Sequence, residues 1–331
     1  MRDVAALARV SVKTVSRVVN DEPGVKPEVR LRVQQAAHRL DYRPNLTASN
    51  LRRSSGRTRT VGALVQDINN SFSSALLRSL EEVARERGVA VLAASLDEDA
   101  ERERALVGDL VARRVDGLVL MPATDRQDYL GADLRAGLPT VFVDRAPRGV
   151  EADAVTVDNV AGACAATRHL LERGHRRIAY LGDAITIRTA ADRLEGYRGA
   201  LAAAGVPVPE DLVVPGLRTP EAGQAAVDRL LELPEPPTAI FAGRNNLSIG
   251  AVRALRQAGC QHRVALVGFD DFPLADVLEP ALTVVRQDVG RIGACVGELL
   301  VSRLDGDTSE PRHVLVQPTL VVRGSGEIAP G

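Results

Sequence analysis

The first residues of the chain form short amphipathic segments separated by turns. Val15, Val18 and Val19 fall at the i, i+3 and i+4 positions that share one face of a helix, which predicts a helix with a buried and an exposed face. Ser11 is placed to cap this helix, because its hydroxyl can accept an unpaired N–H of the first turn. A shorter helix is predicted over residues 3–8. Two short helices joined by a tight turn are typical of a helix-turn-helix that binds DNA, and an ordinary helical hairpin is the alternative.

A third helix is predicted from Pro27, which suits the first position of a helix, with Glu28 favourable near its positive end. The three helices define a head over residues 1–44. Residues 45–60 hold a short segment and a polar linker.

From residue 61 the pattern changes to short apolar runs that alternate with helical stretches. Strands are predicted over residues 61–65, 89–93, 115–121, 139–143, 177–181, 238–242 and 264–269, and helices over residues 74–87, 100–113, 193–204, 221–233, 246–258 and 290–304. Apolar strands separated by helices indicate parallel sheets covered on both faces. Two successive sets of such elements predict two lobes with a ligand cleft between them.

Charge separates the head from the rest of the chain. Residues 1–60 carry thirteen Lys or Arg residues and five Asp or Glu residues, whereas the remaining 271 residues carry 29 and 38. A basic head on an acidic body is typical of a nucleic-acid-binding module attached to an independent domain.

Other features of the composition exclude several protein classes. The chain has no apolar run of membrane-spanning length, no secretory signal at its N-terminus, and three widely spaced cysteines. We therefore expect a cytoplasmic protein without membrane association, disulfide framework or zinc site.

Several motifs in the head occur in a fixed order. They are Asp3-Val4-Ala5, Val10-Ser11, the run from Thr14 to Asn20, Tyr42-Arg43-Pro44-Asn45, Ala48 and Leu51. On these residues the head resembles that of the LacI/GalR family of bacterial transcription regulators. The resemblance implies that the second helix lies in the major groove, where Val12, Lys13 and Arg17 contact base edges. The residues assigned to DNA binding are Val12, Lys13, Thr14, Ser16, Arg17, Asn20, Tyr42, Asn45, Ala48, Leu51 and Arg52.

The resemblance also gives residues 45–60 a role, as a hinge helix and linker that order on the operator. Leu51 matches the leucine that the family inserts into the minor groove at the operator centre. Two positions depart from the family. Arg9 stands in the turn where Gly is common, and a left-handed backbone there costs Arg about 1 kcal/mol, which leaves the conformation of the turn open. Lys26 replaces the usual Ser cap of the third helix.

The body resembles the periplasmic-binding-protein-like core of the same family. The resemblance implies a ligand-binding and dimerisation domain over residues 61–326, in which the chain crosses three times between two lobes, each a parallel sheet with helices on both faces. The expected first lobe covers about residues 61–157 and 289–317, and the second about 158–288 and 318–326, before a tail at 327–331. The expected fold is thus a small all-α head followed by an α/β body.

Polar residues follow many of the predicted strands, and ligands of open α/β sheets bind beyond the carboxyl ends of strands. Arg193 lies in an Arg-x-x-Gly-aromatic motif, in which the family's Arg reaches the effector. The candidate effector-binding residues are Asp67, Phe72, Asp144, Asp158, Arg193, Arg244, Asp270 and Gln287. A single Asp in such a place is more often a helix cap or a turn former, but the shared position of the set favours ligand contact. An array of Asp, Asn and Arg suits a hydroxyl-rich ligand.

Arg244 and Asn245 stand near the positions where the family usually has Asn and Asp. The added cation makes an anionic effector plausible, such as a sugar acid or a sugar phosphate. The alternative is an Arg244 paired with a neighbouring Asp and an ordinary sugar. Aromatic residues are only 3% of the chain, so Phe72, Phe241 and Phe272 are the possible stacking platforms, with core packing as the alternative for each.

The sequence contains no phosphate-binding loop, metal-ligand spacing, nucleophile elbow or dinucleotide fingerprint. His169 and His175 are interpreted as surface residues near a helix end, not as metal ligands. We therefore expect no enzyme and no cofactor. The sequence favours a homodimeric repressor that a sugar-type effector releases from a pseudo-palindromic DNA operator. The alternative is a solute-binding protein that delivers sugar to a transporter, which the basic head and the missing signal peptide oppose.

Overall fold

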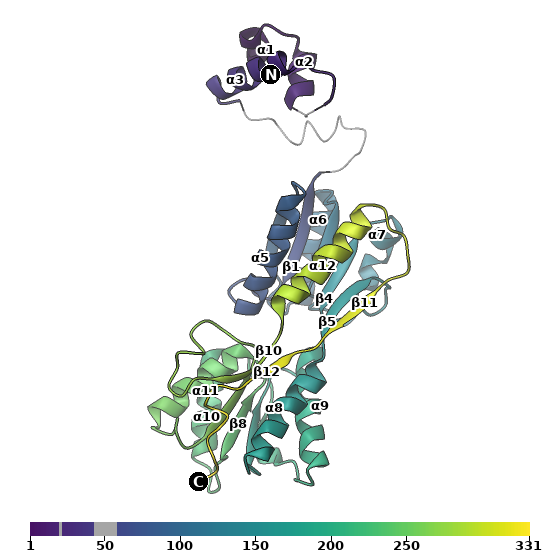
Figure 1. The fold of residues 1–331 in the computed structure, drawn as a ribbon. Coiled ribbons are helices and arrows are strands. Elements are labelled where there is room, and N and C mark those ends of the chain that lie inside the picture. Colours follow the sequence, from purple (N-terminus) through teal and green to yellow (C-terminus); the bar gives the residue numbers. More distant parts are fainter. Residues whose placement is uncertain (20–21, 43–57) are drawn as a thin grey trace. The chain divides into compact units, whose positions relative to one another are not determined.

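The computed structural model of the chain describes residues 1–19, 22–42 and 58–331 (Figure 1). The chain forms two compact units, a head over Met1–Arg59 and a body over Thr60–Gly331. No helix in the described ranges is both long and apolar enough to span a membrane.

The head is a bundle of three short helices, α1 (Arg2–Ala8), α2 (Val12–Val19) and α3 (Pro27–Arg39). Small and β-branched side chains from all three helices form its core: Val4, Ala5, Ala8, Val15, Val18, Val33 and Ala36. Because these residues recur every three or four positions along each helix, each helix buries one face and leaves the other exposed.

The turn between α1 and α2 keeps a left-handed residue although that residue is not glycine. Arg9 has φ 52° and ψ 50°, and its N–H donates to the carbonyl of Ala6. Ser11 caps α2 as predicted, accepting a hydrogen bond from the N–H of Thr14 at 3.1 Å. At the start of α3, the side chain of Lys26 makes no capping hydrogen bond in the described head, so this helix begins without the support that a Ser would provide.

The first lobe of the body is a sheet of six parallel strands in the order β11-β5-β4-β3-β1-β2. Its strands are β1 (Thr60–Val65), β2 (Ala90–Ser95), β3 (Gly117–Leu120), β4 (Thr140–Asp144), β5 (Asp153–Val157) and β11 (His313–Val316), and its helices are α5 (Ser71–Glu86), α6 (Ala100–Ala112), η1 (Asp128–Leu130), α7 (Gly131–Arg135) and α12 (Val289–Leu304). Alternate residues of β4 point to opposite faces. Val141 and Val143 pack with α5 and α12, whereas Phe142 packs with α6.

The second lobe has the strand order β12-β10-β9-β8-β6-β7. Its strands are β6 (Ile178–Leu181), β7 (Val213–Val214), β8 (Ala239–Ala242), β9 (Ala265–Phe269), β10 (Thr283–Arg286) and β12 (Thr319–Val321), and its helices are α8 (Asn159–Glu172), α9 (Arg188–Ala203), η2 (Glu210–Leu212), α10 (Pro220–Leu231) and α11 (Asn245–Gln257). Helices α8 and α9 cover one face of this sheet, and α10 and α11 cover the other (Figure 1).

The expectation of a wholly parallel second sheet is wrong at β12, which pairs antiparallel with β10. The chain leaves the second lobe at the carboxyl end of β10 and returns beside it, so that Thr319 lies opposite Arg286. A strand that enters where its neighbour ends must run in the opposite direction.

The interpretation of His169 and His175 as surface residues is also wrong. Both are buried, and His175 contacts the Thr238 hydroxyl through Nδ1 at 2.9 Å and the Ile328 carbonyl through Nε2 at 2.8 Å. Nε2 of His169 lies 2.6 Å from the carboxylate of Glu327. Residues 327–331 are the predicted tail. Its first residues, Glu327 and Ile328, pack on the second lobe and cover both histidines.

Candidate functional site

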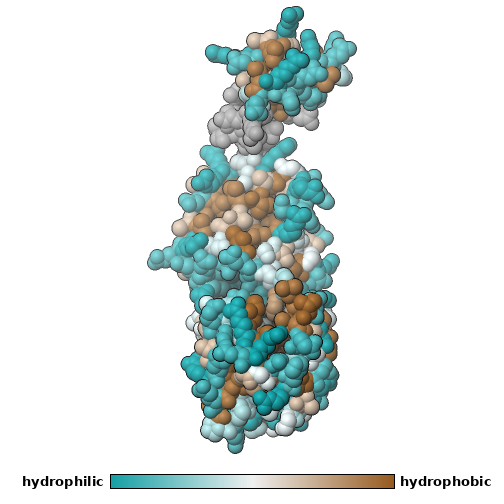
Figure 2. Space-filling view, turned by 90° about the vertical axis from the view of Figure 1, so that its left-hand side faces the viewer, coloured by the Kyte–Doolittle hydropathy of each residue, from teal (hydrophilic) through white to brown (hydrophobic). Residues whose placement is uncertain are grey.

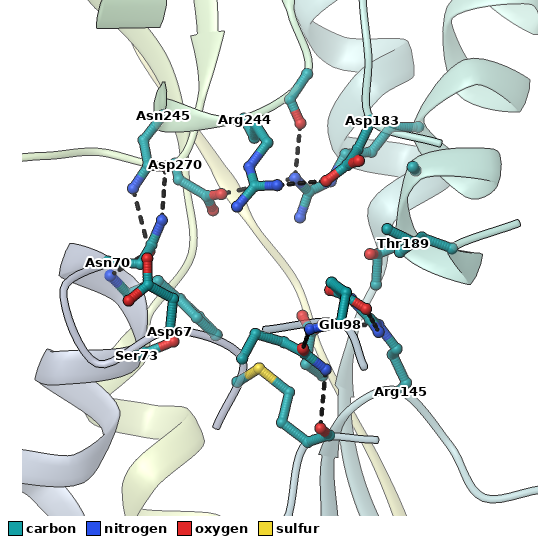
Figure 3. A pocket seen from close by; sticks show the side chains of 18 of the residues that line it. Asp67, Asn70, Ser73, Glu98, Arg145, Asp183, Thr189, Arg244, Asn245 and Asp270 are labelled. Carbon is teal, nitrogen blue, oxygen red and sulfur yellow. Dashed lines mark hydrogen bonds and ion pairs between the residues drawn. The ribbon is translucent and has the colours of Figure 1, made fainter. Parts of the chain in front are cut away.

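A polar cleft lies between the two lobes of the body, at the carboxyl ends of their central strands (Figure 3). Ligands of open α/β sheets bind at this end of the strands. The polar lining residues are Gln66, Asp67, Asn70, Ser73, Glu98, Asp144, Arg145, Asp183, Thr189, Arg193, Arg244, Asn245, Asp270 and Gln287.

The loop after β1 forms part of the first-lobe wall. Asp67 accepts a hydrogen bond from the N–H of Asn69 at 2.8 Å, which closes a tight turn. Asn70 then caps α5 by accepting from the N–H of Phe72 at 3.0 Å. This short sequence of turn and cap brings Asp67, Asn70 and the Phe72 ring to the cleft.

A charged cluster follows β4 in the same wall. Arg145 donates through Nη1 to the Glu98 carboxylate and to the Pro122 carbonyl, both at 2.7 Å, and its Nε lies 3.5 Å from Asp144. Burial raises the pKa of the Asp144 carboxyl above its ordinary value, although the Arg145 charge opposes the shift. Asp144 has φ 69°, a left-handed conformation that Asp tolerates better than most residues and that turns its side chain toward the cleft.

Arg193 is held rigidly in the second-lobe wall. Its Nε donates to the Asn159 side chain at 2.8 Å, and its Nη1 donates to the Gly243 carbonyl at 2.7 Å. The guanidinium lies 3.7 Å from the centre of the Phe269 ring and 3.6 Å from the Asp270 carboxylate. These contacts hold the guanidinium in this position.

Asp270 links Arg193 to Gln287, because its carboxylate also accepts from Nε2 of Gln287 at 2.5 Å. Oε1 of Gln287 is buried and has no hydrogen-bond partner among the described residues. A buried acceptor without a partner is costly, and this oxygen has the capacity to accept one more hydrogen bond.

Arg244 pairs with Asp183, the neighbouring carboxylate that the sequence left as an alternative. Figure 3 shows both side chains at the second-lobe edge of the cleft. Nε of Arg218 lies 3.8 Å from the other carboxylate oxygen of Asp183. The cation at position 244 is therefore neutralised inside the cleft itself.

The cleft brings together seven of the eight candidate effector residues, and Asp158 is the exception. Asp158 caps α8 by accepting from the N–H of Ala161 at 2.9 Å, so its carboxylate is already engaged where the chain crosses between lobes. Phe241 is fully buried in the second-lobe core and offers no stacking surface. Phe72 lines the cleft, and Phe272 packs against the second-lobe core.

The candidate effector residues left out Glu98, Arg145, Asp183 and Asn245, which also line the cleft. Two of them carried a usable signal, since Arg145 directly follows Asp144, and Asp183 lies just beyond a predicted strand. Glu98 carried none, because it reaches the cleft from a turn in which both it and Asp97 have left-handed backbones.

The head presents α2 as its candidate DNA interface. Val12 and Lys13 are exposed on the first turn of α2, and Ser16 is half-buried one turn later. Thr14 is partly buried, with its hydroxyl 2.9 Å from that of Ser11.

Arg17 is exposed, but its guanidinium interacts with neighbouring residues of the head. It donates to the Pro23 carbonyl at 3.2 Å and lies 3.6 Å from the Glu22 carboxylate. Tyr42 packs against the head core. The other candidates lie outside the described residues: Asn20, Asn45, Ala48, Leu51 and Arg52.

Comparison with known proteins finds two family models that match different parts of the chain. Residues 1–45 match the family described as bacterial regulatory proteins, lacI family, and residues 167–326 match a periplasmic binding protein-like domain. The ribose operon repressor of Escherichia coli is 33% identical over 98% of this chain and 99% of its own length.

Two solved structures share the fold over 98% of each chain. The complex of the transcriptional regulator CelR with cellobiose is 36% identical, with a TM-score of 0.72. The Lac repressor dimer bound to its operator and the anti-inducer ONPF is 24% identical, with a TM-score of 0.84, and this likeness concerns the fold alone.

Proposed function

Because this chain belongs to the LacI family of bacterial regulatory proteins, we propose that it is a homodimeric repressor that leaves its DNA operator when a neutral, hydroxyl-rich effector binds in the cleft. The observation that carries the proposal is the combination, in one chain, of a capped helix exposing Val12 and Lys13 with a cleft of fixed hydrogen-bonding groups.

The charge pairing in the cleft supports a neutral effector. Each guanidinium of the cleft has a carboxylate partner: Arg145 pairs with Glu98, Arg193 with Asp270, and Arg244 with Asp183. Asp67 and Asp144 add two carboxylates, which accept hydrogen bonds from hydroxyls. We therefore favour an ordinary sugar over a sugar acid or a sugar phosphate.

The edge of the first sheet supports a homodimer. β2 is an edge strand, and Leu92 on it is 42% exposed. A groove beside β2 is lined by apolar residues that include Leu77 and Val91, with Arg78, Glu81 and Arg85 among them. Figure 2, which faces the α5 side, shows apolar residues gathered on the first lobe. An exposed apolar edge of this kind is typically buried against another protein surface. A second copy of the chain can bury this edge against its own β2 edge, and the two-fold symmetry of such a dimer matches a pseudo-palindromic operator.

A solute-binding protein is the second candidate for the body alone, and the head argues against it. Members of the family are transcription regulators, and we propose no reaction for the cleft. The proposed site of action is chromosomal DNA in the cytoplasm.

The test uses the full chain and a variant that lacks residues 1–59. Selection from random duplexes should enrich a pseudo-palindromic sequence for the full chain, with affinity that falls steeply as salt rises. A thermal-shift screen with neutral sugars, ribose and cellobiose among them, should then find a ligand that raises the melting temperature of the body and weakens operator binding. Undiminished DNA binding by the headless variant would refute the proposal.

A further inference from the structure

Asp183 is held at the mouth of the cleft by bonds in three directions. It is 8% exposed, and its Oδ1 accepts a hydrogen bond from the N–H of Ala184 at 2.8 Å. Its Oδ2 accepts from Nη1 of Arg244, and Arg218 approaches from the rim. The carboxylate is therefore a fixed part of the wall, unlike a mobile surface side chain.

Strand register places Asp183 beside Arg244. β6 and β8 are parallel neighbours in which Leu181 lies opposite Ala242, and the pairing continues through a hydrogen bond from the Gly243 N–H to the Leu181 carbonyl at 2.7 Å. Asp183 and Arg244 each stand two residues beyond this last pair. Parallel strands in register bring such positions to the same edge of the sheet, so the ion pair follows from the backbone.

Glycine at position 182 is required for this arrangement. A Cβ there would lie 2.5 Å from the ring of Tyr180, a buried core residue that cannot move aside. The close approach of chain and ring sets the path that delivers Asp183 to the cleft.

Without the Asp183 carboxylate, the second-lobe wall would be strongly cationic. Its charged residues are Arg193 and Asp270, which pair with each other, and Arg244, with Arg218 at the rim. Asp183 is the carboxylate that contacts Arg244 among the residues that the structure describes. A guanidinium released from it would present a planar set of N–H donors to the cleft, which is the arrangement that binds phosphate or carboxylate.

We propose that Asp183 is a specificity-determining residue: its carboxylate forms an ion pair with the guanidinium of Arg244 and thereby excludes anionic effectors from the cleft. The inference rests on the proposed function, in that the cleft is taken as the effector site. It explains how the chain carries Arg244 in the cleft and still selects a neutral ligand.

The test measures binding of inorganic phosphate to the full chain by calorimetry. Asp183→Asn keeps an oxygen that can accept from Ala184 but removes the charge that holds Arg244. We expect D183N to bind phosphate at least about tenfold more tightly than the unmodified chain, since charge-assisted hydrogen bonds of a freed guanidinium are gained. The double variant D183N/R244Q should lose that gain.

The matched control is Asp67→Asn, which removes one negative charge from the same cleft. Asp67 forms no ion pair with any residue in the described ranges, so D67N changes the charge of the cleft without releasing a guanidinium. An equal gain in D67N would show that total charge alone excludes anions and would overturn the proposal. So would phosphate binding by the unmodified chain as tight as that of folded D183N.

Two further measurements keep the result interpretable. Asp183→Ser, whose hydroxyl can also accept from Ala184, repeats the test if D183N does not fold. In the unmodified chain, phosphate should leave the guanidinium NMR signals of Arg244 unchanged, and a saturable shift would contradict the proposal. If the chain binds a neutral sugar and an operator while D183N gains no phosphate affinity, the specificity proposal fails and the proposed function stands. Loss of the function itself would instead appear as absence of DNA binding by the unmodified chain.

Discussion

The side-chain amides of Asn70 and Asn245 donate hydrogen bonds to each other across the cleft, from Nδ2 to Oδ1 at 2.9 and 3.3 Å. Asn70 caps α5 in the first lobe, and Asn245 lies in the first turn of α11 in the second. Nδ2 of Asn245 also donates to the Ser71 hydroxyl at 3.0 Å. The starts of these two helices are therefore tied to each other by side-chain hydrogen bonds that join the two lobes.

The exchange of Asn245 for Asp should weaken this tie. A carboxylate can still accept from Asn70, but it donates to neither Asn70 nor Ser71. We expect N245D to lower the free energy of unfolding of the body by about 1–2 kcal/mol and to speed hydrogen exchange at the start of α5.

The matched control is Asn246→Asp, the same exchange one residue later. The Asn246 side chain donates a hydrogen bond to the Arg218 carbonyl at 3.5 Å, within the second lobe. Faster exchange in α5 for both variants would mean that added charge, and not the loss of the tie, is responsible.

Arg193→Ala should abolish the effector response and spare operator binding. The substitution removes the donor that holds Asn159, the Gly243 carbonyl and Asp270 in place. We expect the affinity for the inducing sugar to fall about 100-fold, because the substitution removes one or two charge-assisted hydrogen bonds to the sugar. Titration of the operator complex with that sugar measures the effect. Arg188→Ala, which removes an exposed arginine from the same helix, should change the titration little.

Asp144→Asn should change how the stability of the body depends on pH. Burial raises the pKa of this carboxyl in the folded chain above its value of 3.8 when unfolded. As the pH rises from 3.8, the unfolded chain loses this proton before the folded chain does, so the carboxyl increasingly destabilises the fold until the raised pKa is passed.

The amide that D144N introduces does not titrate, and an Asn side chain tolerates the left-handed backbone of this position. The stability of D144N relative to the unmodified chain should therefore increase with pH across that window and then level off. Denaturant unfolding at a series of pH values measures it, with Asp109→Asn on the exposed face of α6 as control. A difference independent of pH would count against the argument.

Arg9→Gly should stabilise the head. Arg9 adopts φ 52°, where a Cβ is disfavoured, and Gly removes that cost at the price of a more flexible unfolded chain. A net gain of up to about 1 kcal/mol is expected in the hydrogen-exchange stability of α1 and α2. Arg9→Ala removes the same charge but keeps Cβ, so an equal gain in R9A would attribute the effect to charge.

Leu92→Glu should convert the proposed dimer into monomers. A charge on the exposed face of edge strand β2 would have to be buried against the second copy. Light scattering after size-exclusion chromatography reports the mass. Leu315→Glu is the control, because Leu315 is 56% exposed on β11, the opposite edge of the same sheet. A dimer that survives in L92E would place the interface elsewhere.

Much of this molecule is determined locally and was therefore predictable from sequence. The spacing of Val15 and Val18 and the cap at Ser11 are properties of one turn of helix, and α2 forms as they predict. The apolar runs of the body are likewise strands. Most of the polar residues that follow them reach a common cleft, Asp158 excepted, because parallel strands of a sheet end at one edge.

Other features depend on which segments become neighbours, and only the tertiary structure decided them. The sequence left open whether Arg244 binds an anionic ligand or pairs with an Asp. The register of β6 with β8 places it beside Asp183, 61 residues away, and the two form an ion pair. β12 is antiparallel because of where the chain re-enters the second lobe, and His175 is buried because the C-terminal residues fold over it. Periodicity reports the burial of a residue along its own helix or strand, whereas a contact between distant residues depends on register and on crossings between lobes, which no local pattern encodes.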